Sequence, residues 1–459
     1  MRHLSKVIFI ILFLFAVFSL ALKDADKKNK TYAPLILISI DGLKPDYVTE
    51  ADKYNLKIPH LRKFFSDGAY GSGVKGVAPS VTYPAHTTII TGVSPNKHGI
   101  LHNKPFDPFN KNNGGWYWYA GDIKTETLWD KATEAGLITA NIEWPVTVGA
   151  NFTYNIPQYW RGTSWDNHKI LKVVSSFGLL GEAEKAVGGY PYGYRDSIKD
   201  DDRRKEFNIF VLENKKPDLH FCYLTGLDTE QHQTGPYSKE TFFVLEETDS
   251  LVGQIIASAQ KISNNLATIC VVSDHGFVTT DKKISINAAF RWADLLGVNP
   301  DDDNKLVSWK AFSWDAGGSA GIFLKDNDEE LYQKTYSVLL DLADRTRDEF
   351  IIDKIITGDE LTSIGGFAGV SFIVSINPKS GYVLGNDLST ILNHGSGYKW
   401  GSHGYLPEFE EMDGSFFITG PGIPKNLNLG RIDMRDIATT LAGLLKIKLE
   451  QAEGRDLLK

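Results

Sequence analysis

Short apolar runs that end at an acidic residue recur along the chain. They are residues 35–40 before Asp41, residues 219–227 before Asp228, and residues 267–273 before Asp274. Runs of this length with little polar alternation are typical of strands that are buried on both faces of a parallel sheet. The sequence therefore predicts three such strands.

Two longer amphipathic stretches separate these predicted strands. Residues 125–135 end at Gly136, a common helix stop, and residues 240–261 repeat their apolar positions at a period near 3.6. Alternating strands and helices predict an α/β fold with a mostly parallel central sheet and helices on both faces. The active site of such a sheet lies beyond the carboxyl ends of its strands, so we expect the three aspartates at one edge.

The remaining stretches are less regular. Residues 154–194 are rich in Gly, Trp and Tyr and weakly periodic, which favours an irregular lobe or loops that cover a substrate. Residues 277–399 are interpreted as an inserted cap subdomain. The catalytic core would then comprise residues 22–276 and 400–459, with a final strand at 416–419 and a helix at 434–445.

The first residues have the pattern of a targeting segment. Arg2 and Lys6 precede an apolar run over 7–18, and small residues at 19–21 suit a cleavage site. We expect a secretory signal peptide at residues 1–21 and a secreted or periplasmic protein. An uncleaved anchor is the alternative, but the run is shorter than the roughly 20 residues that a spanning helix needs. No stable transmembrane anchor is therefore expected.

Composition narrows the classes of function. The chain has 459 residues and a formal net charge of −8, which argues against a nucleic-acid-binding surface. Its two cysteines, Cys222 and Cys270, lie in apolar runs and either pair or stay buried as free thiols; neither arrangement makes a disulfide-stapled fold. An acidic protein that binds phosphate esters needs local positive charge, which a metal cluster can supply.

Acidic residues and histidines recur at the predicted strand ends. Asp228 and His232 are four residues apart and share one face of a helical turn, and Asp274 is followed at once by His275. His403 lies in a loop with glycine on either side. Each signal is weak alone, but carboxylate and imidazole ligands together suit Zn²⁺. Their shared place at the expected active-site edge makes the combination specific.

The segment SVTYPAHTTIITG places Thr82 at a predicted helix start, with Pro84 near the first helical position. A polar residue there is either a helix cap or a nucleophile, held where backbone N–H groups favour an anion. A threonine hydroxyl is a poor nucleophile at neutral pH and needs a base or a metal to activate it. The strand-end ligands provide such a metal site and favour the nucleophile. We interpret His86, Thr87 and Thr88 as support within the helix.

Six motifs follow one another along the chain: ISIDGLKPDY, APSVTYPAHTTIITGVSPNKHGILHN, LTGLDTEQHQTGP, VVSDHGF, GSHGY and FFITGPGI. Their order and spacing resemble the nucleotide pyrophosphatase/phosphodiesterase family, the type I phosphodiesterases of the alkaline phosphatase superfamily. The resemblance covers nearly the whole mature chain. It implies an alkaline phosphatase-like core that holds two Zn²⁺ per chain. The implied ligands are Asp228, His232 and His403 for one zinc, and Asp41, Asp274, His275 and the Thr82 oxygen for the other.

The resemblance also implies a reaction. Thr82 would attack phosphorus to form a phosphothreonine ester, and a water activated at the other zinc would then release the phosphate. Asn103 occupies the position of a side chain that contacts the phosphoryl oxygens, although outside the resemblance it would be interpreted as a turn asparagine. The expected substrates are nucleotides and related small phosphodiesters or pyrophosphates.

Related activities on this fold differ at single positions. Sulfatases need Cys or Ser at the nucleophile position with Pro and Arg following, and this chain has Thr82 with no Arg after it. An inactive binding protein would have lost a ligand or the nucleophile, and every one of these positions is filled. Close family members usually carry Asn where this chain has Ala85, which weakens the transfer of animal-type substrate preferences.

The alternative function is an alkaline phosphomonoesterase on the same two-zinc site. A diester offers a second substituent that suits an apolar groove, whereas a monoester suits extra positive side chains. Tyr83 either stacks on a nucleobase or packs in the core, and the sequence leaves both open. Arg161 or Lys169 would suit a monoester. Further aromatic candidates for the groove are Trp144, Tyr159 and Trp160. On balance the sequence favours the diester.

Overall fold

The computed structural model describes residues 33–161, 166–194, 196–326 and 328–459. The predicted signal peptide at residues 1–21 lies outside these ranges. Within them, no helix is both long and apolar enough to cross a membrane.

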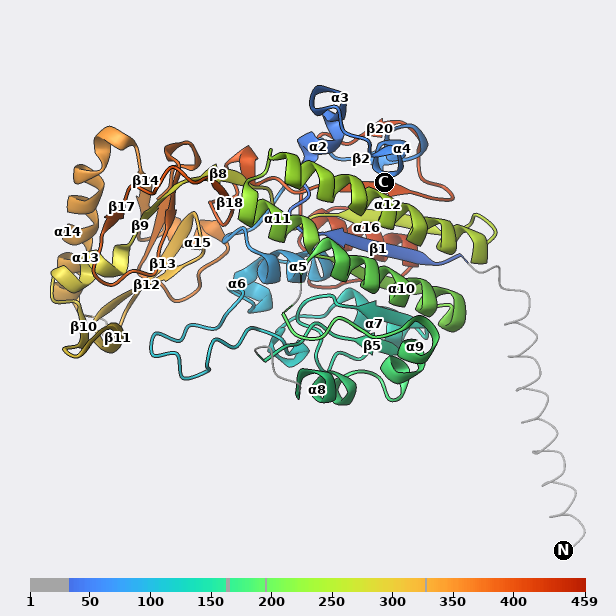
Figure 1. Cartoon of the computed structure of the whole chain (residues 1–459), viewed down its shortest axis with the longest axis horizontal. Helices are drawn as coiled ribbons and strands as arrows, with labels where there is room; N and C mark the ends of the chain where they lie inside the picture. The colour runs from blue at the N-terminus through green and yellow to red at the C-terminus, as the bar shows by residue number, and fades with distance from the viewer. Residues whose placement is uncertain (1–32, 162–165, 195, 327) are drawn as a thin grey trace, which may run out of the picture.

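An eight-stranded sheet forms the centre of the molecule (Figure 1). Its strands in spatial order are β20 (Leu427–Asn428), β2 (Ala69–Tyr70), β19 (Phe416–Thr419), β7 (Thr268–Val272), β1 (Leu35–Ile40), β6 (Leu219–Leu224), β4 (Thr139–Ile142) and β5 (Tyr154–Ile156). β1 pairs in parallel with both β6 and β7, and β4 and β5 continue the parallel order. Only β19 runs against its neighbours β7 and β2 among these described strands. The expected mostly parallel sheet is confirmed.

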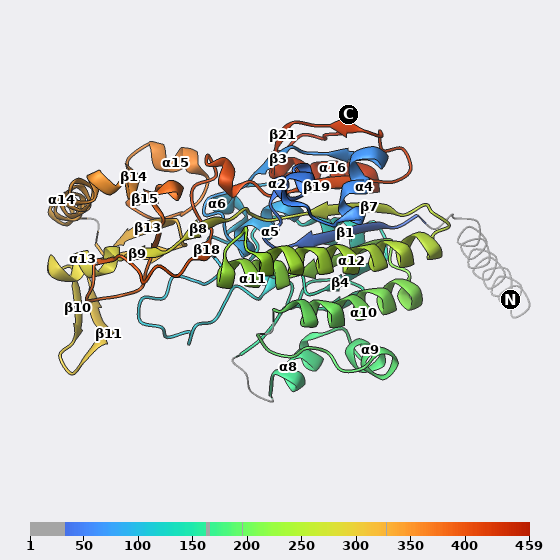
Figure 2. The ribbon, with the colours of Figure 1, turned by 45° about the horizontal axis from the view of Figure 1, so that its top comes forward.

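Helices cover both faces of this sheet. Leu35 and Leu37 of β1 join one apolar core, and Ile36 and Ile38 join another, because successive side chains of a strand point to opposite faces. The first core is completed by α5 (Thr82–Thr91), α7 (Leu128–Glu134) and α16 (Arg435–Leu445). The second is completed by α2 (Pro45–Thr49), α4 (Pro59–Asp67), α10 (Ile198–Lys215) and α12 (Lys239–Ile262). Figure 2 shows α10 and α12 side by side along the sheet.

The two cysteines lie on opposite faces of the sheet. Cys222 belongs to the core that contains Ile38, and Cys270 to the core that contains Leu37. Both are free and buried, and burial raises the pKa of each thiol. The question that the sequence left open is thus answered in favour of free thiols.

Two stretches differ from their sequence-based expectation. Residues 154–194 are more regular than expected, because β5 is followed by α8 (Asp166–Val174) and α9 (Leu179–Val187), which share an apolar core with α10. The strand at 416–419 is present, but it is not the last, since β20 and β21 (Arg431–Asp433) follow it. These late strands are two and three residues long, too short to give a periodic signal.

The segment over 277–399 carries a second sheet, at the left of Figure 1. Its antiparallel strands in order are β12 (Ala311–Asp315), β13 (Ser319–Leu324), β15 (Phe372–Ile376) and β14 (Ile352–Ile356). Nearby lie α13 (Ile286–Trp292), α14 (Glu329–Arg345) and the hairpin of β10 (Leu296–Asn299) and β11 (Asp302–Trp309). A separate apolar core fills this region and reaches Tyr405 and Met412. This core supports an inserted subdomain, whose boundaries stay a prediction.

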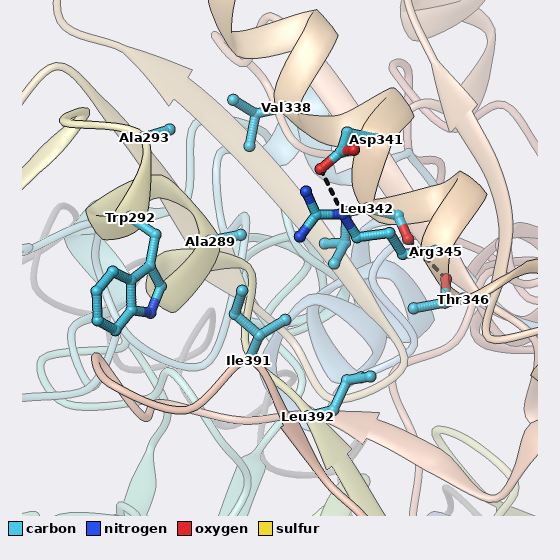
Figure 3. Close-up of a pocket in the computed structure, with 10 residues that line it drawn as sticks. All are labelled: Ala289, Trp292, Ala293, Val338, Asp341, Leu342, Arg345, Thr346, Ile391 and Leu392. Atoms are coloured by element: carbon cyan, nitrogen blue, oxygen red, sulfur yellow. Dashed lines mark hydrogen bonds and ion pairs between the residues drawn. The ribbon is translucent and has the colours of Figure 1, made fainter.

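A pocket lies within this inserted segment, between α13 and α14 (Figure 3). Trp292 and Leu342 line it, and an ion pair of 2.9 Å joins Arg345 to Asp341. None of the residues that the sequence assigns to the active site lines this pocket.

Candidate active site

The carboxyl ends of β1, β6 and β7 bring the three aspartates together. Asp41 follows β1 directly, and Asp274 comes two residues after β7. Asp228 lies in the first turn of α11 (Gly226–Thr234), which begins two residues after β6. The expected strand over 219–227 is therefore shorter than predicted, because the apolar Leu227 is buried in this helix instead.

Four polar atoms of this cluster are buried and have no hydrogen-bond partner within the described residues: Asp41 Oδ1, Asp228 Oδ1, Asp274 Oδ2 and His275 Nε2. His275 Nε2 lies 3.4 Å from Asp41 Oδ1 and 3.2 Å from Asp274 Oδ2. Leaving so many buried polar atoms unsatisfied in one place is costly in a folded protein. Cations bound among these atoms would satisfy them, so the residues present fit a metal site.

The three histidines of the cluster are oriented by backbone carbonyls, with Nε2 left toward the cluster. Each Nδ1 faces a backbone carbonyl, at 3.0 Å for His232 and Gly401, 3.2 Å for His275 and Gly276, and 2.9 Å for His403 and Ser80. A carbonyl only accepts, so each Nδ1 carries a hydrogen, and a neutral ring in this tautomer has its lone pair on Nε2. Burial lowers the pKa of His403 to about 3 and that of His275 well below its usual range. Both rings are therefore neutral, as metal ligands must be.

The carboxylates repel one another in the absence of a cation. Burial raises the pKa of Asp41, and the neighbouring Asp228 and Asp274 raise it further. Burial also raises the pKa of Asp228 to about 7. A divalent cation between these groups would reverse the effect, because opposite charge favours the ionised carboxylate.

The potential ligands form two overlapping sets. Asp41, Asp274 and His275 make one, and Asp228, His275 and His403 make the other; within each set the ligand atoms lie within 4.8 Å of one another. His275 joins both because its ring stacks on that of His403, with centroids 3.6 Å apart. His232 lies at the edge, with Nε2 3.5 Å from Asp228 Oδ1. The six expected ligands thus lie in one cluster, although the two sets share His275 and neither set includes His232.

Thr82 is the first residue of α5 and lines a pocket with Asp41 and Asp228. The residue before it, Val81, has an extended backbone and caps the helix without a side-chain hydrogen bond. Asn103 Oδ1 accepts the backbone N–H that follows Thr82, at 2.9 Å. This fixes the amide orientation of Asn103, since its acceptor is used and its NH₂ group remains as the donor.

Tyr83 packs in the interior, which was one of the two roles that the sequence left open for it. Only 1% of its surface is exposed, its hydroxyl donates to Gln158 Oε1 at 2.7 Å, and it contacts Ile100 and Val146. Its ring still forms part of the pocket beside Thr82. Burial leaves little of it for stacking on a ligand.

Other aromatic side chains line this pocket, and sequence reasoning missed most of them. They are Trp116, Trp160, Tyr194 and Tyr223, of which only Trp160 was a candidate. Two further candidates do not reach the pocket. Trp144 is buried against His86, and Tyr159 packs on Trp118, with ring centroids 4.9 Å and 5.0 Å apart. Three of the residues that line the pocket come from separate loops and Tyr223 comes from β6, so no sequence spacing connects them.

The expected support within α5 is provided mainly by His86. Its Nδ1 lies 2.8 Å from the carbonyl oxygen of Thr82, and its Nε2 lies 2.8 Å from Ser39 Oγ on β1. Both ring nitrogens are engaged, so His86 connects the helix start to the central sheet. Thr87 and Thr88 bond backbone carbonyls within the same segment.

A buried ionic network holds the start of α11, which carries Asp228 and His232. Asp201 of α10 accepts the backbone N–H groups of Thr225 and Gly226, at 3.1 Å and 2.7 Å. Arg204 donates to Asp201 Oδ1 at 2.9 Å and to the Thr225 hydroxyl at 3.0 Å. Asp201 therefore caps α11 from another helix, where negative charge is favourable. No sequence motif indicates this contact.

Comparisons with known proteins identify the family of this chain. A model of the family "Type I phosphodiesterase / nucleotide pyrophosphatase" matches residues 35–355. Venom phosphodiesterase of Naja atra is 23% identical over 438 residues, which cover 91% of this chain and 44% of the relative. Bis(5'-adenosyl)-triphosphatase ENPP4 of Pongo abelii is 25% identical over 57% of this chain and 52% of its own length. The chain thus spans about half the length of these relatives.

A solved structure has the same fold. Human ectonucleotide pyrophosphatase/phosphodiesterase 5 superposes with a TM-score of 0.64 at 19% identity, over 92% of this chain and 97% of that chain. The family model covers more than two thirds of the 459 residues and includes the strands that carry Asp41, Asp228 and Asp274. This chain belongs to the type I phosphodiesterase / nucleotide pyrophosphatase family.

Proposed function

We propose that this protein is a zinc-dependent hydrolase that cleaves phosphodiester or pyrophosphate bonds of nucleotides and related small esters. The observation that carries the proposal is the convergence of buried, unpartnered Asp and His atoms beside a threonine at a helix start. The family membership and the names of the relatives support the substrate class.

Two Zn²⁺ are the proposed cofactors. Asp228, His232 and His403 would hold one, and Asp41, Asp274, His275 and the Thr82 oxygen the other. When bound, such a metal pair lowers the pKa of oxygen nucleophiles and neutralises the charge that develops on the attacking and leaving oxygens. The mixed carboxylate and imidazole donors suit zinc, and the neutral rings of His275 and His403 can coordinate it through Nε2.

Thr82 is the proposed nucleophile. Its hydroxyl loses its proton and Oγ forms a bond to phosphorus while the bond from phosphorus to the leaving oxygen breaks. The leaving oxygen takes up a proton, and a phosphothreonine ester remains. Water then attacks from the opposite side, the bond between phosphorus and Oγ breaks, and the hydroxyl regains a proton. Asn103 holds the phosphoryl oxygens through its free NH₂ donors, and the N-terminal end of α5 favours their negative charge.

The charges around Thr82 favour a diester over a monoester. The charged side chains that line its pocket, within the described ranges, are Asp41, Asp196 and Asp228, and all are acidic. Arg161 donates to the Asn112 carbonyl at 2.9 Å, and Lys169 pairs with Asp166 at 3.0 Å, so neither serves the extra charge of a monoester.

Substitution of the nucleophile tests the proposal. Thr82→Ala should abolish hydrolysis while the zinc content stays near that of the wild type, because six ligands remain. Retention of most activity would refute the role of Thr82. A nitrophenyl ester of a nucleoside monophosphate, compared with nitrophenyl phosphate at equal zinc, tests the diester preference. Faster turnover of the monoester would favour the phosphomonoesterase instead.

Export is the proposed destination. The pattern of residues 1–21 supports a cleaved signal peptide and a secreted or periplasmic enzyme. Expression of the full chain in an exporting host, followed by N-terminal sequencing of the exported product, should place the new terminus near residue 22. An unprocessed terminus on a membrane-bound protein would contradict this.

A further inference from the structure

A groove of about 1140 Å³ opens between the core and the inserted segment. One wall is the loop over 102–116, which follows α6 (Pro95–His98), and the other includes Leu306 and residues 312–315. In Figure 1 this loop extends from α6 toward the side of β10 and β11. The proposed reaction uses only one residue that lines the groove, Asn103.

The inner end of the groove adjoins the active site. Asn103, which bonds the residue after Thr82, lines the groove, and Trp116 lines both the groove and the pocket beside Thr82. On the other wall, Gly318 donates its N–H to the carbonyl of His403 at 3.0 Å, just beyond the strand that lines the groove. The groove therefore begins beside the nucleophile and a proposed metal ligand.

The groove is locally basic in an acidic protein. Lys104, Lys111 and Lys305 line it, and none of them forms an ion pair with any described side chain. Its acidic residues are Asp107 and Asp315, and burial raises the pKa of Asp315 to about 7. Three unpaired lysines in a chain of net charge −8 favour an anionic ligand by charge complementarity.

Ring systems lie beside these charges. The Trp314 ring stacks with His102, with centroids 4.9 Å apart and planes inclined by 22°. The Lys104 ammonium lies 5.5 Å from the centre of the Trp116 ring, and Phe109 is 42% exposed. Aromatic faces next to cations suit a ligand that has both a planar ring and phosphate charge.

We propose that this groove binds the departing half of an extended substrate, one whose leaving group carries further phosphate and a nucleobase. The proposal rests on the proposed function, since in-line attack by Thr82 expels the leaving group on the opposite side of phosphorus. The loop over 102–116 and the inserted segment then select dinucleoside polyphosphates over esters with a small leaving group. Lys111 and Lys305 contact the phosphates, and Phe109 contacts the base.

Three substrates with the same adenylyl half separate the contributions: nitrophenyl adenosine monophosphate, ATP and diadenosine tetraphosphate. The double variant Lys111→Met/Lys305→Met should lower kcat/KM for the tetraphosphate and ATP by about tenfold and leave the nitrophenyl ester within twofold. The control is Lys334→Met/Lys379→Met, which removes the same charge from exposed positions of the inserted segment outside the groove. Equal losses with the two double variants would overturn the proposal.

Phe109→Ala isolates the ring contact. It should lower kcat/KM for diadenosine tetraphosphate by about tenfold, because the second base loses its stacking on the aromatic ring, and leave ATP unaffected. Equal effects on both substrates would overturn the base contact.

A binding measurement keeps this inference separate from the proposed function. The lysine double variant, placed in the Thr82→Ala background, should bind diadenosine tetraphosphate about tenfold more weakly than Thr82→Ala alone. Unchanged binding would refute the groove. Failure of the wild type to cleave any of the three substrates would refute the proposed function instead.

Discussion

Replacement of Asp201 by asparagine perturbs the buried network that holds α11. Asp201 is fully buried and accepts three hydrogen bonds, from the backbone of Thr225 and Gly226 and from Arg204. Asparagine has the same shape but only one acceptor oxygen and no charge. At least one backbone N–H loses its partner, and Arg204 loses one of its buried counter-charges.

The expected loss is about 3–5 kcal/mol in the free energy of unfolding, the range for breaking one side of a buried ion pair. Because α11 carries Asp228 and His232, zinc affinity should also fall, by about 10- to 100-fold. Urea unfolding followed by circular dichroism gives the first quantity, and competition with a zinc chelator gives the second.

Asp202→Asn is the matched control. Asp202 is the next residue of α10, its side chain is 56% exposed, and it pairs with the buried Lys205, which also pairs with Glu206 at 2.7 Å. Because Asp202 is exposed and Lys205 keeps Glu206 as a partner, this change should cost about 1 kcal/mol or less and leave zinc affinity unchanged. If Asp201→Asn costs no more than Asp202→Asn, the capping of α11 by Asp201 is refuted.

Three further predictions concern pH, metal binding and thiols. Burial raises the pKa of Glu143 to about 7, so between pH 4.5 and 7 the folded protein binds more protons at this group than the unfolded protein does, and its stability falls as pH rises. Glu143→Gln should flatten this decline, measured as the urea midpoint of unfolding at each pH. An unchanged slope would contradict the prediction. The zinc affinity of the metal-free protein should rise steeply through pH 7, because Asp228 must lose its proton to bind the metal. If titration calorimetry gives the same zinc affinity at pH 6 and pH 8, Asp228 is not a ligand. Cys222 and Cys270 should resist iodoacetamide until the protein unfolds, and mass spectrometry of rapid labelling in the folded state would disprove their burial.

The sequence predicted the centre of the fold well because its strands are buried on both faces. β1 matches its apolar run of residues 35–40 at both ends, and α12 and α16 lie within one residue of their expected bounds. The run at 219–227 was misjudged at its end, because apolar residues continue from β6 into α11 without a break. The direction of the strand at 416–419 could not be predicted, because an apolar run contains no signal for antiparallel pairing.

The candidate ligands could be found because each follows a strand or lies in a glycine-rich loop at the same sheet edge. The environment of Thr82 could not be predicted, because its aromatic lining depends on which side chains point inward from segments that are far apart in the sequence. Tyr83 shows the difficulty. Its sequence position suits a groove or a core equally well, and its burial and its hydrogen bond to Gln158, both formed by residues distant in sequence, decide between them. The cap by Asp201 likewise depends on the packing of two helices, which local sequence does not record.

The most direct test of the account is the zinc content of the purified and dialysed protein, measured by inductively coupled plasma mass spectrometry. The account predicts two Zn²⁺ per chain in the wild type and in Thr82→Ala, and about one in His403→Ala. A wild type that binds no zinc, or a His403→Ala variant that keeps the full complement, would contradict the central claim that these residues form a two-metal site.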